Sequence, residues 1–149
     1  DGWLEPGTAI NYDDLLALEE IQGVRVEPGD VILLYTGRWK RREALGAWPT
    51  SEGVAGYHAD VAYFLQERGV AMIGHDMWND AAPSGIPNVF LPLHSLALVS
   101  LGVSIFDNLD FGRVAEVAKG LGRYSFMFTA APLRIEMGMG SPVNPLATF

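Results

Sequence analysis

Continuous apolar runs alternate along the chain with segments in which apolar residues recur at helical spacing. Residues 31–35 and 70–73 are short runs rich in β-branched or aromatic residues, typical of strands covered on both faces. Helical spacing predicts helices over residues 11–20, 57–68 and 111–121, the first beginning at Asn11 as a cap. Because helices and strands alternate, the pattern predicts an α/β domain.

The remaining segments continue this alternation. Residues 96–99, Gly102 and residues 103–106 predict a short helix, its glycine stop and a buried strand. Residues 124–130 predict a last strand, which residues 133–135 extend or pair with. Residues 44–54 and 80–92 are rich in Gly and Pro and are predicted loops.

Composition indicates a single domain over residues 1–149. The chain is 49% hydrophobic, which is enough to bury a core, and it contains no cysteine. Its net charge of −8 argues against nucleic acid as a partner. No apolar run has the length of a membrane span and no segment resembles a signal peptide, so we expect no membrane partner and a cytoplasmic location.

The basic residues gather in one place. Arg38, Lys40, Arg41 and Arg42 follow the first predicted strand. The simpler interpretation is a solvated loop, and the alternative is that the cluster supplies one cation for an anionic substrate.

His94 and Asp107 are the first candidate site residues. They lie at the two ends of the predicted helix and strand, which places an imidazole and a carboxylate at one edge of a sheet. These ligands suit Zn²⁺ or Mn²⁺, but a closed protein site needs three or four. For the pair alone we favour a structural interpretation, in which His94 is half-buried at a helix start and Asp107 caps the next turn.

Asp76 and three tryptophans are the second set of candidates. Asp76 follows His75 at the end of a predicted strand, and we favour a structural acceptor for loop backbone over a direct substrate contact. Trp39, Trp48 and Trp78 follow strands and predict an aromatic wall for a flat substrate, although aromatic residues fill cores more often. His58 lacks a second ligand one helical turn away, so we interpret it as a surface histidine.

Four stretches together resemble the metal-dependent cyclase family of hydrolases, the group that contains bacterial kynurenine formamidase and isatin hydrolase. They are GDVILLYTGRW (29–39), GYHADVAYFLQERGVAMIGHD (56–76), residues 94–109 and AAPLRIEMGMGSPVNPLA (130–147). The resemblance implies the swivelling β/β/α fold, a Zn or Mn cofactor, a small amide or lactam substrate and a homo-oligomer.

The resemblance also implies roles for individual residues. His94 matches a histidine ligand of the family, and Asp107 opens a triplet, Asp107-Asn108-Leu109, that matches the family's Glu-Asn-Leu. Asp76 matches an Asp of the family. The family's upstream His-x-Gly-Thr-His-x-Asp motif is absent from these residues. We therefore expect the C-terminal part of a longer family domain, lacking its N-terminal portion.

Two hypotheses follow for function. The first is a metal-dependent hydrolase of an amide, lactam or formamide C–N bond, in which His94 and Asp107 are catalytic and hold the metal. The second is a catalytically inactive protein of the same fold that binds or acts as a scaffold.

Overall fold

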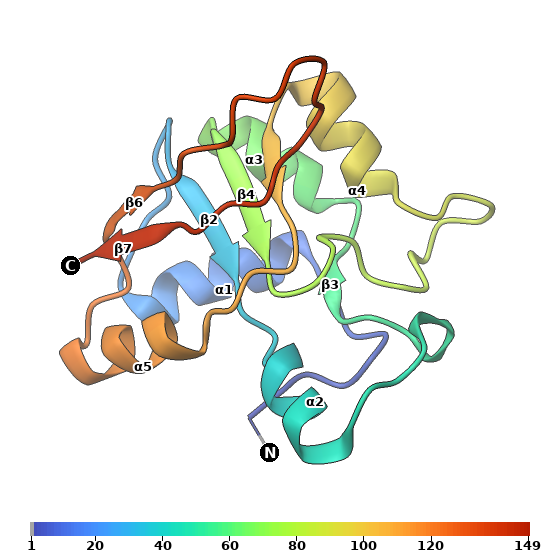
Figure 1. Ribbon diagram of the computed structural model, residues 1–149, viewed down its shortest axis with the longest axis horizontal. Helices are drawn as coiled ribbons and strands as arrows, with labels where there is room; N and C mark the ends of the chain where they lie inside the picture. Colours follow the sequence, from blue (N-terminus) through green and yellow to red (C-terminus); the bar gives the residue numbers. More distant parts are fainter. Residues whose placement is uncertain (1) are drawn as a thin grey trace.

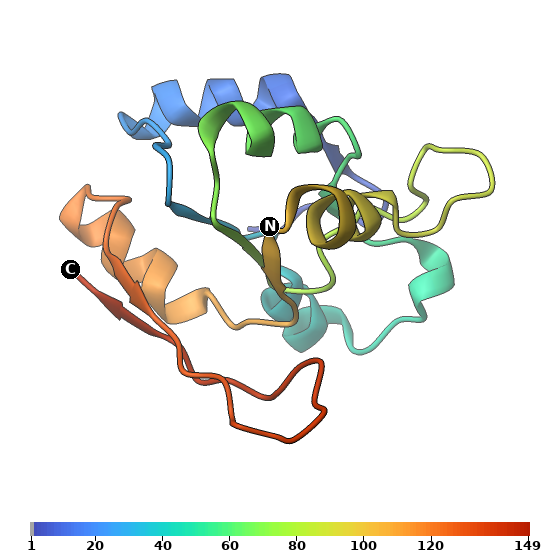
Figure 2. The same ribbon diagram turned by 90° about the horizontal axis from the view of Figure 1, so that it is seen from above.

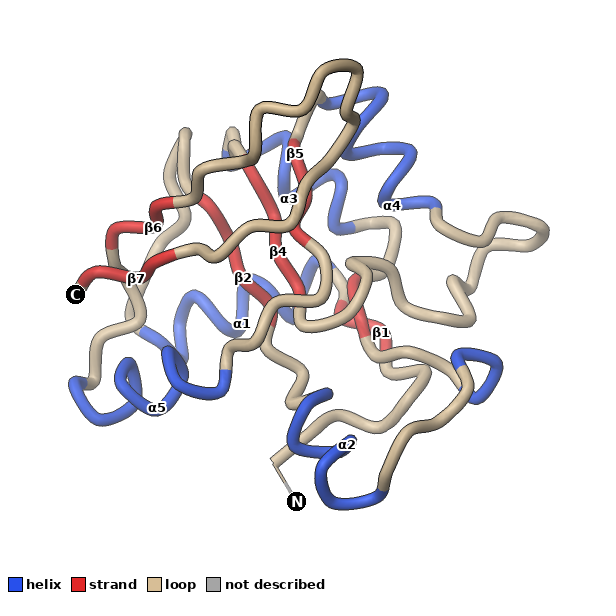
Figure 3. Tube along the Cα trace, viewed as in Figure 1, coloured by secondary structure: helices blue, strands red, loops and turns tan. Residues whose placement is uncertain are grey.

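A three-stranded parallel sheet forms the centre of the molecule (Figure 1; Figure 3). The computed structural model describes residues 2–149. The strands are β2 (Val31–Leu34), β4 (Met72–His75) and β5 (Ser104–Phe106), in the order β2-β4-β5. Because all of them run in the same direction, their carboxyl ends meet at one edge of the sheet.

Helices cover one face of this sheet. Figure 2 shows α1 (Tyr12–Gln22) and α3 (Val61–Arg68) side by side on that face. The segment α4 (Pro92–His94) continues directly into the helix η2 (Ser95–Leu101), which packs beside α3. The main core lies between these helices and the sheet, and its most buried members are Val61, Phe64, Leu65, Ile73, Leu93 and Ala97.

The opposite face carries α5 (Gly112–Leu121) and the antiparallel pair β6 (Met127–Thr129) and β7 (Leu146–Thr148) (Figure 2). A smaller apolar cluster of Phe106, Leu109 and Phe111 fills this side. The predicted pairing of residues 133–135 with the last strand is wrong, because β6 pairs with β7 instead.

The remaining elements lie before β4 in the chain. A second parallel pair joins β1 (Ala9–Ile10) to β3 (Gly56–Tyr57), and a short 3₁₀ turn, η1 (Thr50–Glu52), precedes β3. The sequence predicted a helix over residues 57–68, but α3 begins only at Val61. The predicted start is too early because Tyr57 is 2% exposed and pairs with Ile10 as part of β3.

Residues 38–45 form the helix α2 (Arg38–Leu45) rather than the predicted loop. No apolar period marks this helix, and contacts with other segments hold it. Asp76 accepts a hydrogen bond from the Arg38 amide at 3.0 Å. The guanidinium of Arg38 stacks on Trp39 and that of Arg41 on Trp48, each 4.3 Å from the ring centroid.

Other predicted elements are confirmed. Asn11 caps α1, with its amide donating to Asp14 at 2.8 Å. Gly102, at φ 70°, ends η2 in the left-handed conformation that glycine adopts without strain. Among residues 2–149, none of the helices has the length and apolar character required to cross a bilayer.

An ion pair ties the end of α1 to the end of α3. Arg68 donates to the two carboxylate oxygens of Glu19 at 2.7 and 3.3 Å, and the Val26 amide donates to the same carboxylate at 2.7 Å. Burial alone would raise the pKa of Glu19, but the hydrogen bonds from Arg68 and Val26 outweigh it and lower the pKa below 4.5.

We expect Glu19→Gln to lower the free energy of unfolding by about 1–2 kcal/mol near neutral pH, since the charge-assisted bonds to Arg68 are lost. A carboxylate with a lowered folded-state pKa stabilises the fold above its unfolded pKa, and this contribution disappears as the pH falls. Thermal denaturation of both proteins should therefore differ at about pH 7 and converge near pH 3. A difference that persists undiminished in acid would contradict the ion-pair explanation.

Candidate functional site

Polar side chains collect where β2, β4 and β5 end. Thr36 follows β2, Asp76 follows β4 and Asp107 follows β5. His94, the last residue of α4, lies at the same edge. This is the position at which open α/β sheets bind ligands.

His94 lies between two carboxylates. Its Nδ1 is 2.5 Å from Oδ2 of Asp80, and its Nε2 is 3.4 Å from Oδ2 of Asp107. The hydrogen bonds to Asp107 and Asp80 raise the pKa of His94 to about 9. Since a carboxylate accepts and does not donate, the short contact assigns a proton to Nδ1 and directs Nε2 toward Asp107.

Asp80 fixes the start of α4 as well as the imidazole. Its fully buried carboxylate accepts the Leu93 amide at 2.6 Å and the His94 amide at 3.2 Å. The backbone of Asp80 lies against β3, where a Cβ added to Gly56 would come within 2.6 Å of the Asp80 carbonyl oxygen. The missing side chain at Gly56 is therefore what allows Asp80 to lie here.

Asn79 orients Asp107. Its buried side-chain amide donates to Oδ1 of Asp107 at 2.8 Å and to the Phe106 carbonyl at 2.9 Å. Oδ2 of Asp107 is thereby left facing His94. Burial would raise the pKa of Asp107, but the hydrogen bonds from His94 and Asn79 outweigh it and lower the pKa, so the group is a carboxylate.

His75 and Asp76 are both completely buried behind these residues. Asp76 accepts hydrogen bonds from the Thr36 amide at 3.2 Å, the Thr36 hydroxyl at 2.6 Å and the Arg38 amide at 3.0 Å. Nδ1 of His75 accepts the Met77 amide at 2.8 Å. Burial lowers the pKa of His75, so its imidazole is neutral and carries its proton on Nε2.

The pair His94 and Asp107 fits two ligands of one metal ion. Ligand atoms about 2.0–2.1 Å from a tetrahedral metal lie about 3.4 Å apart, which equals the Nε2–Oδ2 separation. A histidine whose other nitrogen bonds a carboxylate is also the usual arrangement at metal sites. Within residues 2–149, however, no group of three His, Cys, Asp or Glu residues is placed to hold a metal. A metal ion bound by this pair would need further ligands.

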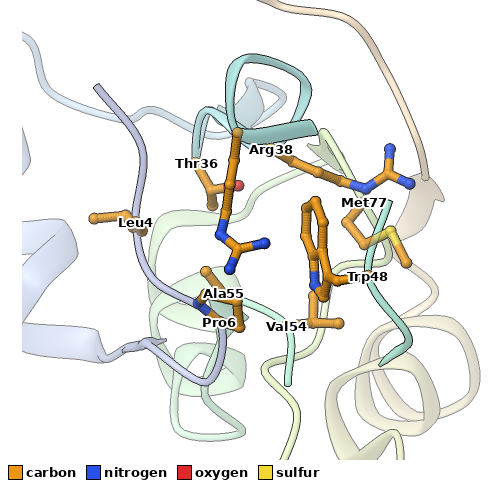
Figure 4. Close-up of a pocket in the computed structure, with 9 residues that line it drawn as sticks. Leu4, Pro6, Thr36, Arg38, Trp48, Val54, Ala55 and Met77 are labelled. Atoms are coloured by element: carbon orange, nitrogen blue, oxygen red, sulfur yellow. The ribbon is translucent and has the colours of Figure 1, made fainter. Parts of the chain in front are cut away.

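A small pocket opens on the same edge, beside the polar cluster (Figure 4). It has a volume of about 20 Å³, close to the space that one water molecule needs. Figure 4 shows Arg38 and Met77 on one side of the Trp48 ring and Thr36 on the other. The lining includes Thr36, Arg38, Arg41, Trp48, Val54 and Met77.

The three candidate tryptophans have different surroundings. Trp48 lines the pocket, whereas Trp39 lies in α2 and donates from Nε1 to the Leu109 carbonyl at 2.9 Å. Trp78 packs edge-on against Phe90 of the loop before α4, with ring centroids 5.5 Å apart. The aromatic wall stays a prediction, and so does the role of Asp76 in substrate binding. His58 precedes α3, with Nδ1 3.0 Å from Asp60, and is remote in sequence from the candidate metal pair.

Sequence reasoning missed Asn79, which it assigned to no element, and Asp80, which it placed at the start of a loop rich in Gly and Pro. Their position along the chain was a usable signal. Both residues closely follow β4, the strand next to β5, and Asp107 was selected because it follows β5 in the same way.

The Cyclase family model matches residues 3–81. The crystal structure of a novel cyclase has a TM-score of 0.84 and 28% sequence identity, covering 99% of this chain and 49% of that chain. No curated protein sequence matches.

Two isatin hydrolase structures are also similar. One, bound to the product analogue thioisatinate, has a TM-score of 0.71 at 22% identity, covering 96% of this chain and 53% of its own. The other, isatin hydrolase A from Ralstonia solanacearum, has a TM-score of 0.72 at 24% identity, with coverages of 95% and 53%. The chain spans about half the length of these solved structures.

Proposed function

This chain belongs to the cyclase family, and we propose that it forms part of a metal-dependent hydrolase of an amide, lactam or formamide C–N bond. The predicted family and the α/β fold class are confirmed by the family model and the similar structures. The similarity to isatin hydrolases supports the choice of reaction. A further similar structure, a potential metal-dependent hydrolase with cyclase activity, supports the metal, at a TM-score of 0.59 and 19% identity.

The observation that carries this proposal is the placement of His94 between Asp80 and Asp107. Asp80 holds the proton on Nδ1, so Nε2 presents its lone pair to a metal once its own proton has left. Asn79 holds Asp107 in the matching orientation. The two ligands are therefore preorganised by residues that do not themselves need to touch the metal.

His94 and Asp107 would hold Zn²⁺ or Mn²⁺ together with further ligands, because two are too few for a closed site. Bound there, the ion would polarise the substrate carbonyl and activate water for attack on the C–N bond. Asp107 is one methylene shorter than the Glu of the family pattern, which favours one metal ion over two. Zinc and manganese both accept imidazole and carboxylate ligands, and we propose either as the cofactor.

The proposed substrate is a small molecule, and the working form is a homo-oligomer. Trp48, which lines the pocket, is the best placed of the four proposed substrate-binding residues Trp39, Trp48, Asp76 and Trp78. Asp76 would act indirectly, because it holds the backbone of Thr36 and Arg38 at the pocket.

A second candidate function is a metal-free binding protein or scaffold of the cyclase fold. The absence of a three-residue ligand group within residues 2–149 favours it. The two functions differ in whether metal is required.

Metal removal from the longest natural form of the protein tests the proposal. We expect dialysis against a chelator to abolish hydrolysis of N-formylkynurenine and isatin, and stoichiometric Zn²⁺ or Mn²⁺ to restore it, since activation of water depends on the ion. Metal content and hydrolysis rate are measured on the same samples. Hydrolysis that survives complete metal removal would refute a metal-dependent mechanism, and a protein that takes up no metal and hydrolyses neither compound would favour the scaffold.

A further inference from the structure

Positive charge lines the pocket of an otherwise acidic chain. The protein carries 18 acidic and 10 basic residues, yet Arg38 and Arg41 both line one small cavity. Among the described residues, Arg38 has no carboxylate within ion-pair distance, and Arg41 has only Glu5 at 3.8 Å. Two guanidinium charges with almost no carboxylate beside them make this pocket favourable for an anion.

Arg41 is the more enclosed of the two. Its guanidinium stacks on the Trp48 ring, and its side chain is 14% exposed. Its buried Nε makes no hydrogen bond within the part of the chain that the structure describes. Glu5 is too distant to satisfy this donor, and its own side chain is 70% exposed. A buried cationic donor without an acceptor costs free energy, which an anionic ligand would recover.

Arg38 connects the pocket to the candidate metal pair. Its Nη1 donates to the side-chain oxygen of Asn108 at 2.9 Å, and Asn108 directly follows Asp107. The backbone amide of Asn108 in turn donates to the backbone carbonyl of Met77 at 2.7 Å, and Met77 also lines the pocket. These hydrogen bonds connect two residues of the pocket lining, Arg38 and Met77, to Asn108, the residue next to the candidate ligand Asp107.

We propose that this pocket binds the carboxylate of the substrate, so that the hydrolase prefers amides that carry an acid group. The assignment rests on the proposed function. Arg41, whose buried Nε has no acceptor among the described residues, supplies the charge-assisted contact, and Arg38 adds positive charge to the lining. The ring and amide of the substrate remain outside. A cavity of about 20 Å³ admits a carboxylate oxygen but excludes a ring.

Two formamides that differ only in the acid group test this inference. Binding of 2-formamidobenzoate and of formanilide is measured by calorimetry on the longest natural form of the protein, so the result does not depend on hydrolysis. We expect the acid to bind at least about tenfold more tightly, as a charge-assisted pair provides. Equal affinities would overturn the carboxylate assignment. Acetate that binds as tightly as 2-formamidobenzoate would show that the pocket holds any small carboxylate, which would overturn its assignment to the substrate.

Arg41→Gln should remove this preference, and Arg42→Gln is the matched control. Arg42 carries the same charge on the same helix but is exposed and does not line the pocket. Equal losses in the two variants would mean that general charge, and not the pocket, attracts the acid. If neither formamide is hydrolysed while Arg41→Gln still abolishes acid binding, the proposed reaction fails and the pocket stands. Hydrolysis of both compounds with the same KM would mean that the reaction stands and the carboxylate assignment fails.

Discussion

Replacing His94 with alanine is expected to lower kcat/KM for amide hydrolysis by about 10³-fold or more, equivalent to about 4 kcal/mol of transition-state stabilisation. The variant loses a metal ligand, and it also leaves Asp80 and Asp107 without the imidazole that lies between them. Metal content, measured by elemental analysis, should fall together with the rate. The assay requires the longest natural form of the protein and the substrate on which the unmodified protein is most active.

His58→Ala is the control for this prediction. His58 also pairs with a carboxylate, Asp60 at 3.0 Å, and its side chain is 29% exposed. We expect metal content and kcat/KM of this variant to stay within about twofold of the unmodified protein, since the polar side-chain contacts of His58 are with Asp60 and not with the candidate ligands. If His94→Ala keeps its metal, or loses its metal without losing rate, the assignment of His94 as a ligand for catalysis is wrong.

The second large effect concerns stability. Asp76→Ala is expected to lower the free energy of unfolding by about 3–5 kcal/mol, because it deletes a completely buried acceptor of three hydrogen bonds. The amides of Thr36 and Arg38 would lose their partner, and the start of α2 would lose its anchor. Urea denaturation followed by circular dichroism measures the change.

Asp13→Ala provides the comparison, since Asp13 is an exposed carboxylate in the first turn of α1. We expect it to change the free energy of unfolding by less than about 1 kcal/mol. If the two substitutions lower the free energy of unfolding equally, the hydrogen bonds of Asp76 add little to stability beyond the effect of removing one negative charge.

The sequence predicted the elements whose patterns are local. Alternating apolar runs and helical segments placed the strands of the central sheet, and a helix, a glycine and a strand between His94 and Asp107 were all found where expected. Parallel strands then brought the two candidate ligands to one edge. That placement required only the direction of the strands and the position of each residue along its own segment.

The features that the sequence did not predict depend on contacts between distant segments. Helix α2 has no apolar period and is held by Asp76 and by stacking of arginines on tryptophans. Tyr57 has helical spacing but enters a strand because Ile10 lies beside it. Asp80 matters because its carboxylate reaches a helix 13 residues later. In each case the two partners are too far apart in the sequence for a local pattern to reveal the contact.

The contact between Gly56 and Asp80 limits which substitutions this chain tolerates. A residue with no side chain, on a different strand pair from the candidate ligands, sets the position of the carboxylate that orients His94. An inventory of reactive residues would miss it, although exchanging this glycine would disturb the site as surely as exchanging an acid.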